Sequence, residues 1–360
     1  MKRVFVSDCE GPIAKNDIAF DLTAHFVPEG DRVFDIIRKY DYVHANFPKR
    51  RDYNVGNTSK LVLPFLLAFD ADNKTVEEFC AANLVLLKGS KATMNYVPKI
   101  SEAFIVSTSY EHYVRALCRE VGFPLENTYS TEINLDEYEL TTKEKTKLKS
   151  LAWEIGGMPS ITIPSNTKAL RDLSSRDQAT ISRLDKIFWK EITGTRCKRI
   201  FSDVNIAGEA EKVNAVQEVA ETLPSPLNDV MYVGDDRTDV EAMKFVRNGG
   251  GLTMSINGDG AAVRNAELAV LCDNSAPISV LADVFLRLGR DEVTSVATNF
   301  DRDSLWRSRA DPILLDRLFE LRPADWPKIY FVTEWNMESV AKESEQFRNT
   351  VLGETIAKRG

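Results

Sequence analysis

The sequence predicts an α/β fold built on a parallel β-sheet, with a helical block inserted directly after the first strand. Short apolar runs of strand character alternate with apolar stripes at helical spacing, and this alternation is typical of parallel sheets. The first run is followed by a long segment that reads as helical throughout. Because 360 residues exceed one ordinary domain, we expect a core domain that carries insertions or an appendage.

Composition and charge limit the classes of function. A content of 43% hydrophobic and 28% charged residues is ordinary for a globular protein with a substantial core. The net charge of −8 argues against nucleic-acid binding as the main function. Five scattered cysteines without a CxxC pair favour reduced thiols in a cytoplasm. We expect no signal peptide and no membrane span, because a strand begins near Met1 and the longest apolar run, 61–69, is too short.

The first strand ends in two acids that predict a metal site. The run Val4-Phe5-Val6 suits a fully buried strand, and Gly11-Pro12 forces a turn soon after it. Asp8 and Glu10 then project on one side at the carboxyl end of the strand, where open α/β sheets place their ligands. Carboxylates this close repel each other unless a cation or another positive charge lies between them.

The helical block extends from about residue 18 to residue 98. Apolar residues from Val33 to Tyr40 have helical spacing. The segment Thr75 to Glu78 has the form of a capping box before another apolar run. Between these helices, Phe47 to Tyr53 predicts a polar, basic loop.

The second strand leads into a candidate anion site. Ala103 to Val106 is a short apolar run that breaks into Ser107-Thr108-Ser109, and a helix closed by Gly122 follows. A strand, a hydroxyl-rich turn and a helix N-terminus together present free backbone N–H groups to an anion.

A second insertion is predicted between residues 131 and 198. Thr141 to Glu144 has the form of a cap for a helix that runs to Ile155. Gln178 to Ile192 is a second predicted helix. The segment from about residue 289 looks mixed but mostly helical, and no chemistry is evident in it.

The strand–helix alternation resumes near residue 200 and carries two further reactive groups. Lys212 lies near the start of an amphipathic helix. The buried run Val230 to Val233 ends in Gly234-Asp235-Asp236-Arg237-Thr238-Asp239. Two more strands are predicted at Leu252 to Ile256 and at Leu268 to Leu271.

Each of these groups alone is a common feature, but their order and context are informative. An acid after a strand, a buried serine, a surface lysine or a Gly-Asp-Asp turn needs no function of its own. A carboxylate pair, a hydroxyl, a lysine and a second carboxylate cluster at successive strand ends are what metal-assisted phosphoryl transfer through an aspartate needs.

These motifs resemble those of the haloacid-dehalogenase (HAD) superfamily of phosphatases. The family's Asp-x-Asp-Gly-Thr is similar to Asp8-Cys9-Glu10-Gly11-Pro12, and its strand-ending Ser or Thr to Ser107. Its lysine corresponds to Lys212 and its Gly-Asp-x-x-x-Asp to the segment 234–239. The helical block looks like the cap of the phosphoserine-phosphatase-like branch. The Asp-Cys-Glu-Gly-Pro variant resembles a mainly archaeal group of HAD proteins.

The resemblance implies a Rossmann-like parallel sheet as the HAD core, with a helical cap inserted after the first strand. The implied segments are a core of residues 1–14, 101–130 and 199–288, a cap of residues 15–100, a second, mostly helical insertion of residues 131–198, and a C-terminal extension of unknown role, residues 289–360.

The resemblance also implies roles for the motif residues. Asp8 attacks phosphorus and forms an aspartyl-phosphate, while Glu10 protonates the leaving oxygen and then deprotonates the attacking water. The implied magnesium ligands are Asp8, the backbone carbonyl of Glu10, and Asp235. Asp239 would support the metal shell or orient Lys212.

The remaining implied roles concern the phosphoryl group. Ser107 and the N–H groups of Thr108 and Ser109 would bind its oxygens, and Lys212 would neutralise charge in the transition state. Asp236 is either a second metal ligand or a turn acid. Two departures from the family pattern also stand out: Glu10 carries an extra methylene, and Pro12 lacks the hydroxyl and N–H of threonine.

We therefore expect a cytoplasmic, magnesium-dependent phosphomonoester hydrolase that acts on a small phosphorylated metabolite. Two alternatives are a phosphotransferase with the same intermediate and a non-catalytic HAD-fold subunit that binds a partner protein. Arg50 and Arg51 could hold an acidic substrate or belong to a solvated loop. The substrate and the oligomeric state stay open at this level.

Overall fold

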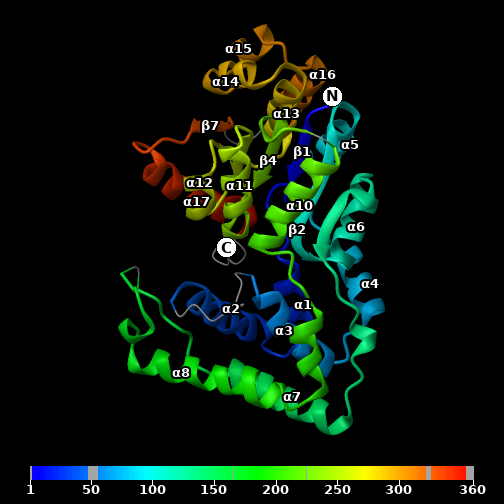
Figure 1. Cartoon of the computed structure of the whole chain (residues 1–360), viewed down its shortest axis with the longest axis vertical. Coiled ribbons are helices and arrows are strands. Elements are labelled where there is room, and N and C mark those ends of the chain that lie inside the picture. Colours follow the sequence, from blue (N-terminus) through cyan, green and yellow to red (C-terminus); the bar gives the residue numbers. More distant parts are fainter. Residues whose placement is uncertain (1, 48–55, 165, 224, 322–325, 354–360) are drawn as a thin grey trace.

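A seven-stranded sheet organises the computed structural model, which describes residues 2–47, 56–164, 166–223, 225–321 and 326–353 (Figure 1). The strand order is β3-β2-β1-β4-β5-β6-β7, and all neighbours are parallel except β6 and β7. The strands are β1 Val4–Ser7, β2 Glu102–Tyr110, β3 Thr128–Thr131, β4 Val230–Gly234, β5 Leu252–Ile256, β6 Leu268–Leu271 and β7 Lys328–Phe331. The predicted α/β fold with a parallel sheet is confirmed.

The central strands are apolar on both faces because helices cover both sides of the sheet. Phe5 of β1 packs into the larger core, whereas Val4 and Val6 pack on the opposite face against α10 (Glu209–Thr222) and α11 (Val240–Asn248). This alternation follows from the two-residue repeat of a strand. Pairing between β1 and β4 continues past Ser7, since the N–H of Asp8 donates to Val233 O at 2.8 Å. Asp8 and the turn after β4 therefore lie side by side.

Strand β2 is longer than the sequence predicted. It runs through the three hydroxyl residues to Tyr110, with a shift of its register against β3 between Val106 and Tyr110. Ser107, Thr108 and Ser109 therefore lie in an irregular strand end, and the prediction of a turn there is wrong. Two features account for the longer strand. The side chain of Tyr110 is fully buried, and Thr131 Oγ1 donates a hydrogen bond to Thr108 O at 2.8 Å.

Among the described residues, five helices lie between β1 and β2, and they divide into two groups. They are α1 Ile18–Phe26, α2 Gly30–Asn46, α3 Thr58–Ala68, α4 Asn73–Asn83 and α5 Ser90–Ile100. Helices α1 to α3 lie beyond the carboxyl ends of the strands, whereas α4 packs on α6 (Glu111–Val121) and α5 on α6 and α13 (Ala276–Leu288) (Figure 1). The capping box of α4 is formed by Asp72 and Thr75, not by Thr75 to Glu78, because the Asp72 carboxylate accepts the Thr75 N–H at 2.7 Å.

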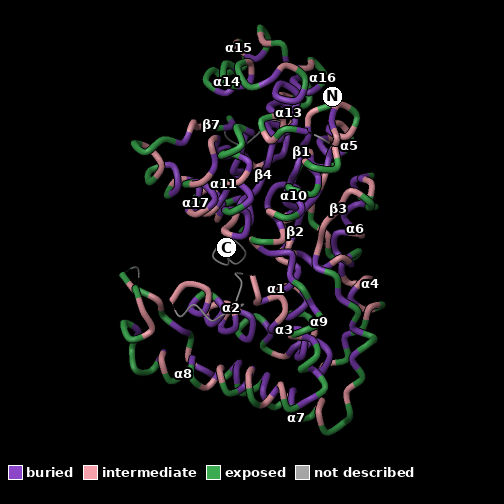
Figure 2. Tube along the Cα trace, in the orientation of Figure 1, coloured by how far each residue is buried: buried purple, intermediate pink, exposed green. Residues whose placement is uncertain are grey.

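The segment predicted as a second insertion packs against the first one. Helix α7 (Thr142–Gly156), with the predicted Thr141 capping box, contacts α2 and α3, and α8 (Ser175–Lys186) continues as a π-helical turn, Ile187–Ile192. We call α1–α3, α7, α8 and this π-helical turn the cap. Buried residues line the interface between its two segments (Figure 2). The cap is thus assembled from two distant stretches of sequence.

The last part of the chain contributes one edge strand to the sheet and a final helix that packs near the sheet. It contains α14 Arg290–Thr298, α15 Arg302–Arg307, α16 Pro312–Glu320, the edge strand β7 and α17 Met337–Leu352. Helix α17 packs against α12 (Gly260–Asn265) and β6. Among the described residues, no helix is both long and apolar enough to cross a membrane.

Candidate active site

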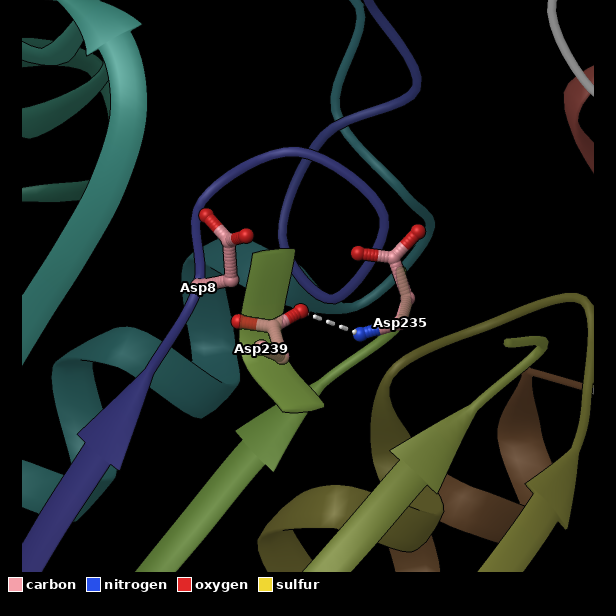
Figure 3. A group of neighbouring side chains, drawn as sticks. All are labelled: Asp8, Asp235 and Asp239. Carbon is pink, nitrogen blue, oxygen red and sulfur yellow. Dashed lines mark hydrogen bonds between the residues drawn. The ribbon is translucent and has the colours of Figure 1, made fainter. Parts of the chain in front are cut away.

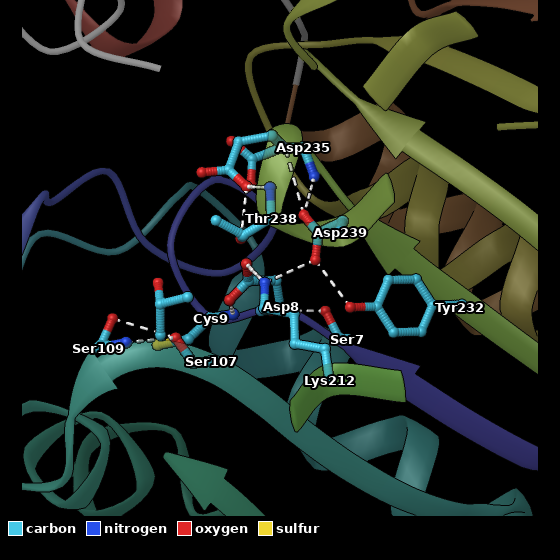
Figure 4. A network of polar contacts seen from close by, with 12 residues as sticks. Ser7, Asp8, Cys9, Ser107, Ser109, Lys212, Tyr232, Asp235, Thr238 and Asp239 are labelled. Carbon is cyan, nitrogen blue, oxygen red and sulfur yellow. Dashed lines mark hydrogen bonds and ion pairs between the residues drawn. The ribbon is translucent and has the colours of Figure 1, made fainter. Parts of the chain in front are cut away.

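The site lies where β1 and β4 end side by side, facing the cap. Asp8 follows β1, and the first turn of α10 brings Lys212 beneath it (Figure 4). Lys212 is fully buried, and its Nζ donates to Asp8 Oδ2 at 2.5 Å and to Asp239 Oδ1 at 2.7 Å. Asp8 Oδ1 also accepts the N–H of Cys9 at 2.5 Å. The carboxylate of Asp8 is therefore held in one orientation.

Asp239 is fully hydrogen-bonded inside this network. Its Oδ1 accepts from Lys212 and from Tyr232 OH at 2.7 Å. Its Oδ2 accepts the main-chain N–H groups of Asp235 at 2.9 Å and Asp236 at 3.2 Å, and Figure 3 shows the first of these bonds. Each oxygen of Asp239 thus accepts two hydrogen bonds, whereas each oxygen of Asp8 accepts one, which favours for Asp239 the role of orienting Lys212 and shaping the turn over direct metal ligation.

Three buried carboxylates form a site suited to a hard cation. Oxygen atoms of Asp8, Asp235 and Asp239 lie within 4.8 Å of one another (Figure 3). Carboxylate oxygens are the donors that Mg²⁺ prefers, and Asp8 and Asp235 are the two with bonding capacity left. Gly11 makes this close packing possible: with φ of 88°, an added Cβ would lie 2.1 Å from Asp235 Cγ.

The charges in this cluster are only partly balanced. Burial raises the pKa of Asp8 to about 7, against the attraction of Lys212, which lowers it. Burial likewise raises the pKa of Asp235 well above its ordinary value, although Arg348 opposes this. For Lys212 burial lowers the pKa, but Asp239 and Asp8 outweigh it and the net pKa is raised. A divalent cation between Asp8 and Asp235 would relieve the remaining excess of negative charge.

Glu10 points toward the cap rather than into the carboxylate cluster. Its Oε1 accepts the N–H of Ile18 at 2.7 Å, at the N-terminus of α1. Burial raises its pKa well above the ordinary range, and the negative charges of Asp17 and Asp8 raise it further. Glu10 therefore holds a proton more tightly than an ordinary glutamic acid, as a general acid requires. Its side chain is not one of the three that form the carboxylate cluster described above.

The residues predicted to bind phosphate differ in whether they reach the cavity beside Asp8. Ser107 is fully buried, and its Oγ donates to Ser109 Oγ at 3.0 Å and accepts the Ser109 N–H at 3.2 Å. Thr108 lines a cavity of about 70 Å³ that also contains Asp8 and Asp235. The structure thus exposes Thr108 to the reacting region, while Ser107 braces the strand end behind it.

A second cavity of about 440 Å³ opens between the cap and the core. It joins the reacting region through Glu10, Thr108 and Asp236, which line both cavities. Asp236 caps the short turn after β4, where its Oδ1 accepts from Thr238 N and Oγ1 at 2.7 Å, so the structure favours the turn-acid interpretation. Arg50 and Arg51, for which the sequence left substrate binding and a solvated loop as alternatives, lie outside the described part of the chain.

Arg348 is the residue that the motifs did not reveal. It lies on α17, is 7% exposed, and lines the small cavity beside Asp235. A sequence signal did exist, because Arg348 falls on the helix face that also buries Val340, Ala341, Ser344 and Val351. A charged residue on a buried helix face is uncommon unless it is paired.

The fold and the site define an α/β protein with a carboxylate cluster at the carboxyl ends of its central strands. A family model of haloacid dehalogenase-like hydrolases matches residues 88–271, just over half of the chain. The chain therefore belongs to this family, which confirms the predicted superfamily and hydrolase class. The matched segment contains Ser107, Lys212 and Asp235 but not Asp8, which the structure places beside Lys212 and Asp235.

Other comparisons bear on the fold. A gene product of Archaeoglobus fulgidus superimposes with a TM-score of 0.78 at 19% identity, over 98% of this chain and 97% of that one. An apo phosphoserine phosphatase gives a TM-score of 0.44 at 10% identity, over 77% of this chain and 98% of that one. A search among curated proteins finds no match. The first similarity shows that the fold, including its C-terminal part, occurs as a whole in another protein.

Proposed function

We propose that the protein is a magnesium-dependent phosphomonoester hydrolase that works through an aspartyl-phosphate. The observation that carries this proposal is the placement of Asp8, which is ion-paired to the buried Lys212 and lies next to Asp235 at the mouth of a cavity. A carboxylate fixed between a lysine and a cation site is equipped to attack phosphorus, since its approach to an anionic ester is not repelled.

Each of the site residues has a distinct role in the proposed reaction. Magnesium would be held by Asp8, Asp235 and the main-chain carbonyl of Glu10, and would neutralise charge on the phosphoryl oxygens. Asp8 Oδ attacks phosphorus and the ester P–O bond breaks, while Glu10 gives its proton to the leaving oxygen. Glu10 then accepts a proton from water as that water attacks phosphorus, which releases phosphate and regenerates Asp8. Lys212 neutralises charge on the phosphoryl group throughout.

The size and lining of the larger cavity support a small organic ester as substrate. Its volume of about 440 Å³ is within the range of small-molecule sites. Its lining combines apolar groups such as Phe34 and Ile163 with cationic ones such as Arg38 and Arg237. Acids such as Asp17 and Asp41 line the same cavity, so its wall suits a leaving group with both an apolar body and a polar end. The five free, buried cysteines support a reducing compartment, as in a cytoplasm.

Hydrolysis of p-nitrophenyl phosphate with and without Mg²⁺ tests the proposal. We expect metal-dependent turnover that falls by about 10³-fold or more in Asp8→Asn. Asp229→Asn is a matched control, because Asp229 pairs with Arg3 at the opposite end of β4. Turnover that survives in Asp8→Asn would contradict the proposal, as would no turnover of any phosphoester together with no binding of a divalent cation. Adding an alcohol as acceptor separates hydrolysis from the phosphotransferase alternative.

A further inference from the structure

Arg348 connects the C-terminal helix to the centre of the site. Its Nη1 donates to the main-chain oxygens of Asp235 at 3.0 Å and Asn257 at 3.2 Å. The same nitrogen forms an ion pair with Asp235 Oδ2. One guanidinium nitrogen therefore ties together the end of β4, the end of β5 and a carboxylate of the cation site.

Helix α17 is fixed independently of that carboxylate. Ser344 Oγ donates to Gly258 O at 2.7 Å, and Glu345 Oε1 accepts the N–H of Gly260 at 3.0 Å. Both contacts lie within one helical turn of Arg348 and join α17 to the segment between β5 and α12. Leu352, at the end of the helix, is buried and lines the small cavity. These contacts therefore position Arg348 without the help of its bond to the Asp235 carboxylate.

The bond from Arg348 leaves one oxygen of Asp235 for another partner. Figure 3 shows the two oxygens of Asp235 pointing apart, one of them toward Asp8. Among the described residues, the hydrogen bonds to this side chain involve Oδ2 alone. A carboxylate held by one oxygen cannot rotate freely, so its other oxygen stays in a defined direction.

We propose that Arg348 is a positioning residue for Asp235, and that α17 thereby completes the active site. The inference rests on the proposed function, because it takes Asp235 to be a ligand of the divalent cation. Charge supports it as well. The carboxylates of Asp8, Asp235 and Asp236 line the small cavity, and among the described residues of its wall Arg348 is the cation. A divalent cation bound there would offset this negative charge, as the capture of a phosphate ester requires.

Binding of Mn²⁺ to the purified full-length chain, followed by calorimetry and by electron paramagnetic resonance, tests the inference. Arg348→Met removes the bond and the charge while keeping much of the volume. We expect its Mn²⁺ dissociation constant to rise by about 10- to 100-fold, the usual effect of losing a residue that orients a metal ligand. Arg348→Lys keeps the charge and a donor, and should recover part of the affinity. Arg348→Gln is a second variant for which the same rise is expected.

Glu343→Gln is the matched control, since Glu343 lies on α17 but contacts Lys328 and Tyr330 of β7. It should bind Mn²⁺ like the wild type. An unchanged affinity in Arg348→Met or Arg348→Gln overturns the inference, and a tighter one would show that the guanidinium competes with the cation for Asp235. A wild-type chain that binds no Mn²⁺ contradicts the proposed function itself, and with it this inference.

Discussion

At the scale of single residues, the two acids of the first loop differ in their partners and hence in their proton affinity. Burial raises the pKa of Asp8 to about 7, and the ammonium group of Lys212, which favours the ionised form, opposes that rise. Glu10 accepts one N–H from Ile18 and faces the negative charge of Asp17. The first arrangement suits a nucleophile and the second suits a proton donor, although the residues are two positions apart.

Glu10→Gln removes the titratable carboxyl of Glu10 but nearly keeps the size and shape of the side chain. A carboxyl whose pKa is raised by folding binds its proton more tightly in the folded state, so stability falls as pH rises from its ordinary value of 4.5 toward the raised value. Glutamine has no such proton. The free energy of unfolding of Glu10→Gln relative to wild type should therefore increase from pH 5 to pH 8, measured by urea unfolding. A difference that does not change with pH would contradict this.

The same variant should lose activity through chemistry rather than through folding. If Glu10 is the general acid, as proposed, its removal should lower kcat by about 10²- to 10⁴-fold, while the amide oxygen still accepts the Ile18 N–H. Glu10→Asp restores the residue usual in the family and should keep more activity than Glu10→Gln. Equal losses in the two variants would show that position, not protonation, decides the rate.

Cation binding should depend on pH because it displaces protons. Without a cation, burial raises the pKa of Asp8 to about 7 and that of Asp235 well above its ordinary value. A divalent cation binds the ionised forms, so its affinity rises with pH until both groups are ionised. For Asp8 alone we expect about a tenfold gain in Mn²⁺ affinity between pH 5.5 and 7. Calorimetry in buffers of different ionisation enthalpy should detect the released protons; no release at pH 6 would be inconsistent with these pKa shifts.

At the scale of elements, the loop after β1 depends on one glycine. Gly11 combines a positive φ with a close approach to the Asp235 carboxylate. Most other residues can adopt such a φ only at a cost, and here the added Cβ would also displace Asp235, the proposed cation ligand. The absence of a side chain at Gly11 therefore explains why the carboxylates of Asp8 and Asp235 can lie so near each other.

Gly11→Ala should weaken cation binding more than it weakens the fold. We expect at least a tenfold rise in the Mn²⁺ dissociation constant, because Asp235 must move away from Asp8. Gly122→Ala is the control: its φ of 71° imposes a similar strain at the end of α6, where the nearest contact is 3.3 Å away in the Asn95 side chain. Equal Mn²⁺ affinities in the two variants would remove the steric explanation.

At the scale of the whole molecule, the cap depends on contacts between its two inserted segments. Tyr40 of α2 is fully buried, donates to Asp185 Oδ1 at 2.7 Å and accepts from Trp189 Nε1 at 2.8 Å. Its ring stacks on Phe188 with centroids 5.4 Å apart. These contacts join α2, which lines the larger cavity, to α8 and to the π-helical turn.

Tyr40→Phe should loosen the cap without disturbing the sheet. The half-buried Asp185 and Trp189 each lose a hydrogen bond, which at about 0.5–1.5 kcal/mol per bond costs about 1–3 kcal/mol in total, while the stacked ring remains. Hydrogen exchange followed by mass spectrometry should show faster exchange in α8 and in Ile187–Ile192, with β1 and β4 unchanged. Acceleration throughout the chain would instead mean that cap and core unfold as one unit.

The sequence was informative about elements whose pattern is local. The buried strands, their carboxyl-terminal acids, the Thr141 capping box and the glycine that ends α6 all follow from short-range periodicity and turn chemistry. Predictions were less accurate where long-range contacts override local preference. Strand β2 continues past its apolar run because Tyr110 and Thr131 hold it, and α4 begins at Asp72 because that carboxylate is the better cap.

By itself, the sequence determined the α/β class, the family and most of the groups at the site, because strand ends converge at one edge of a parallel sheet. Only the tertiary structure decided which groups touch. It paired Lys212 with Asp8 and Asp239, brought Thr108 rather than Ser107 to the cavity, and placed Arg348 against Asp235. These contacts join residues far apart in the chain, and no local pattern encodes them.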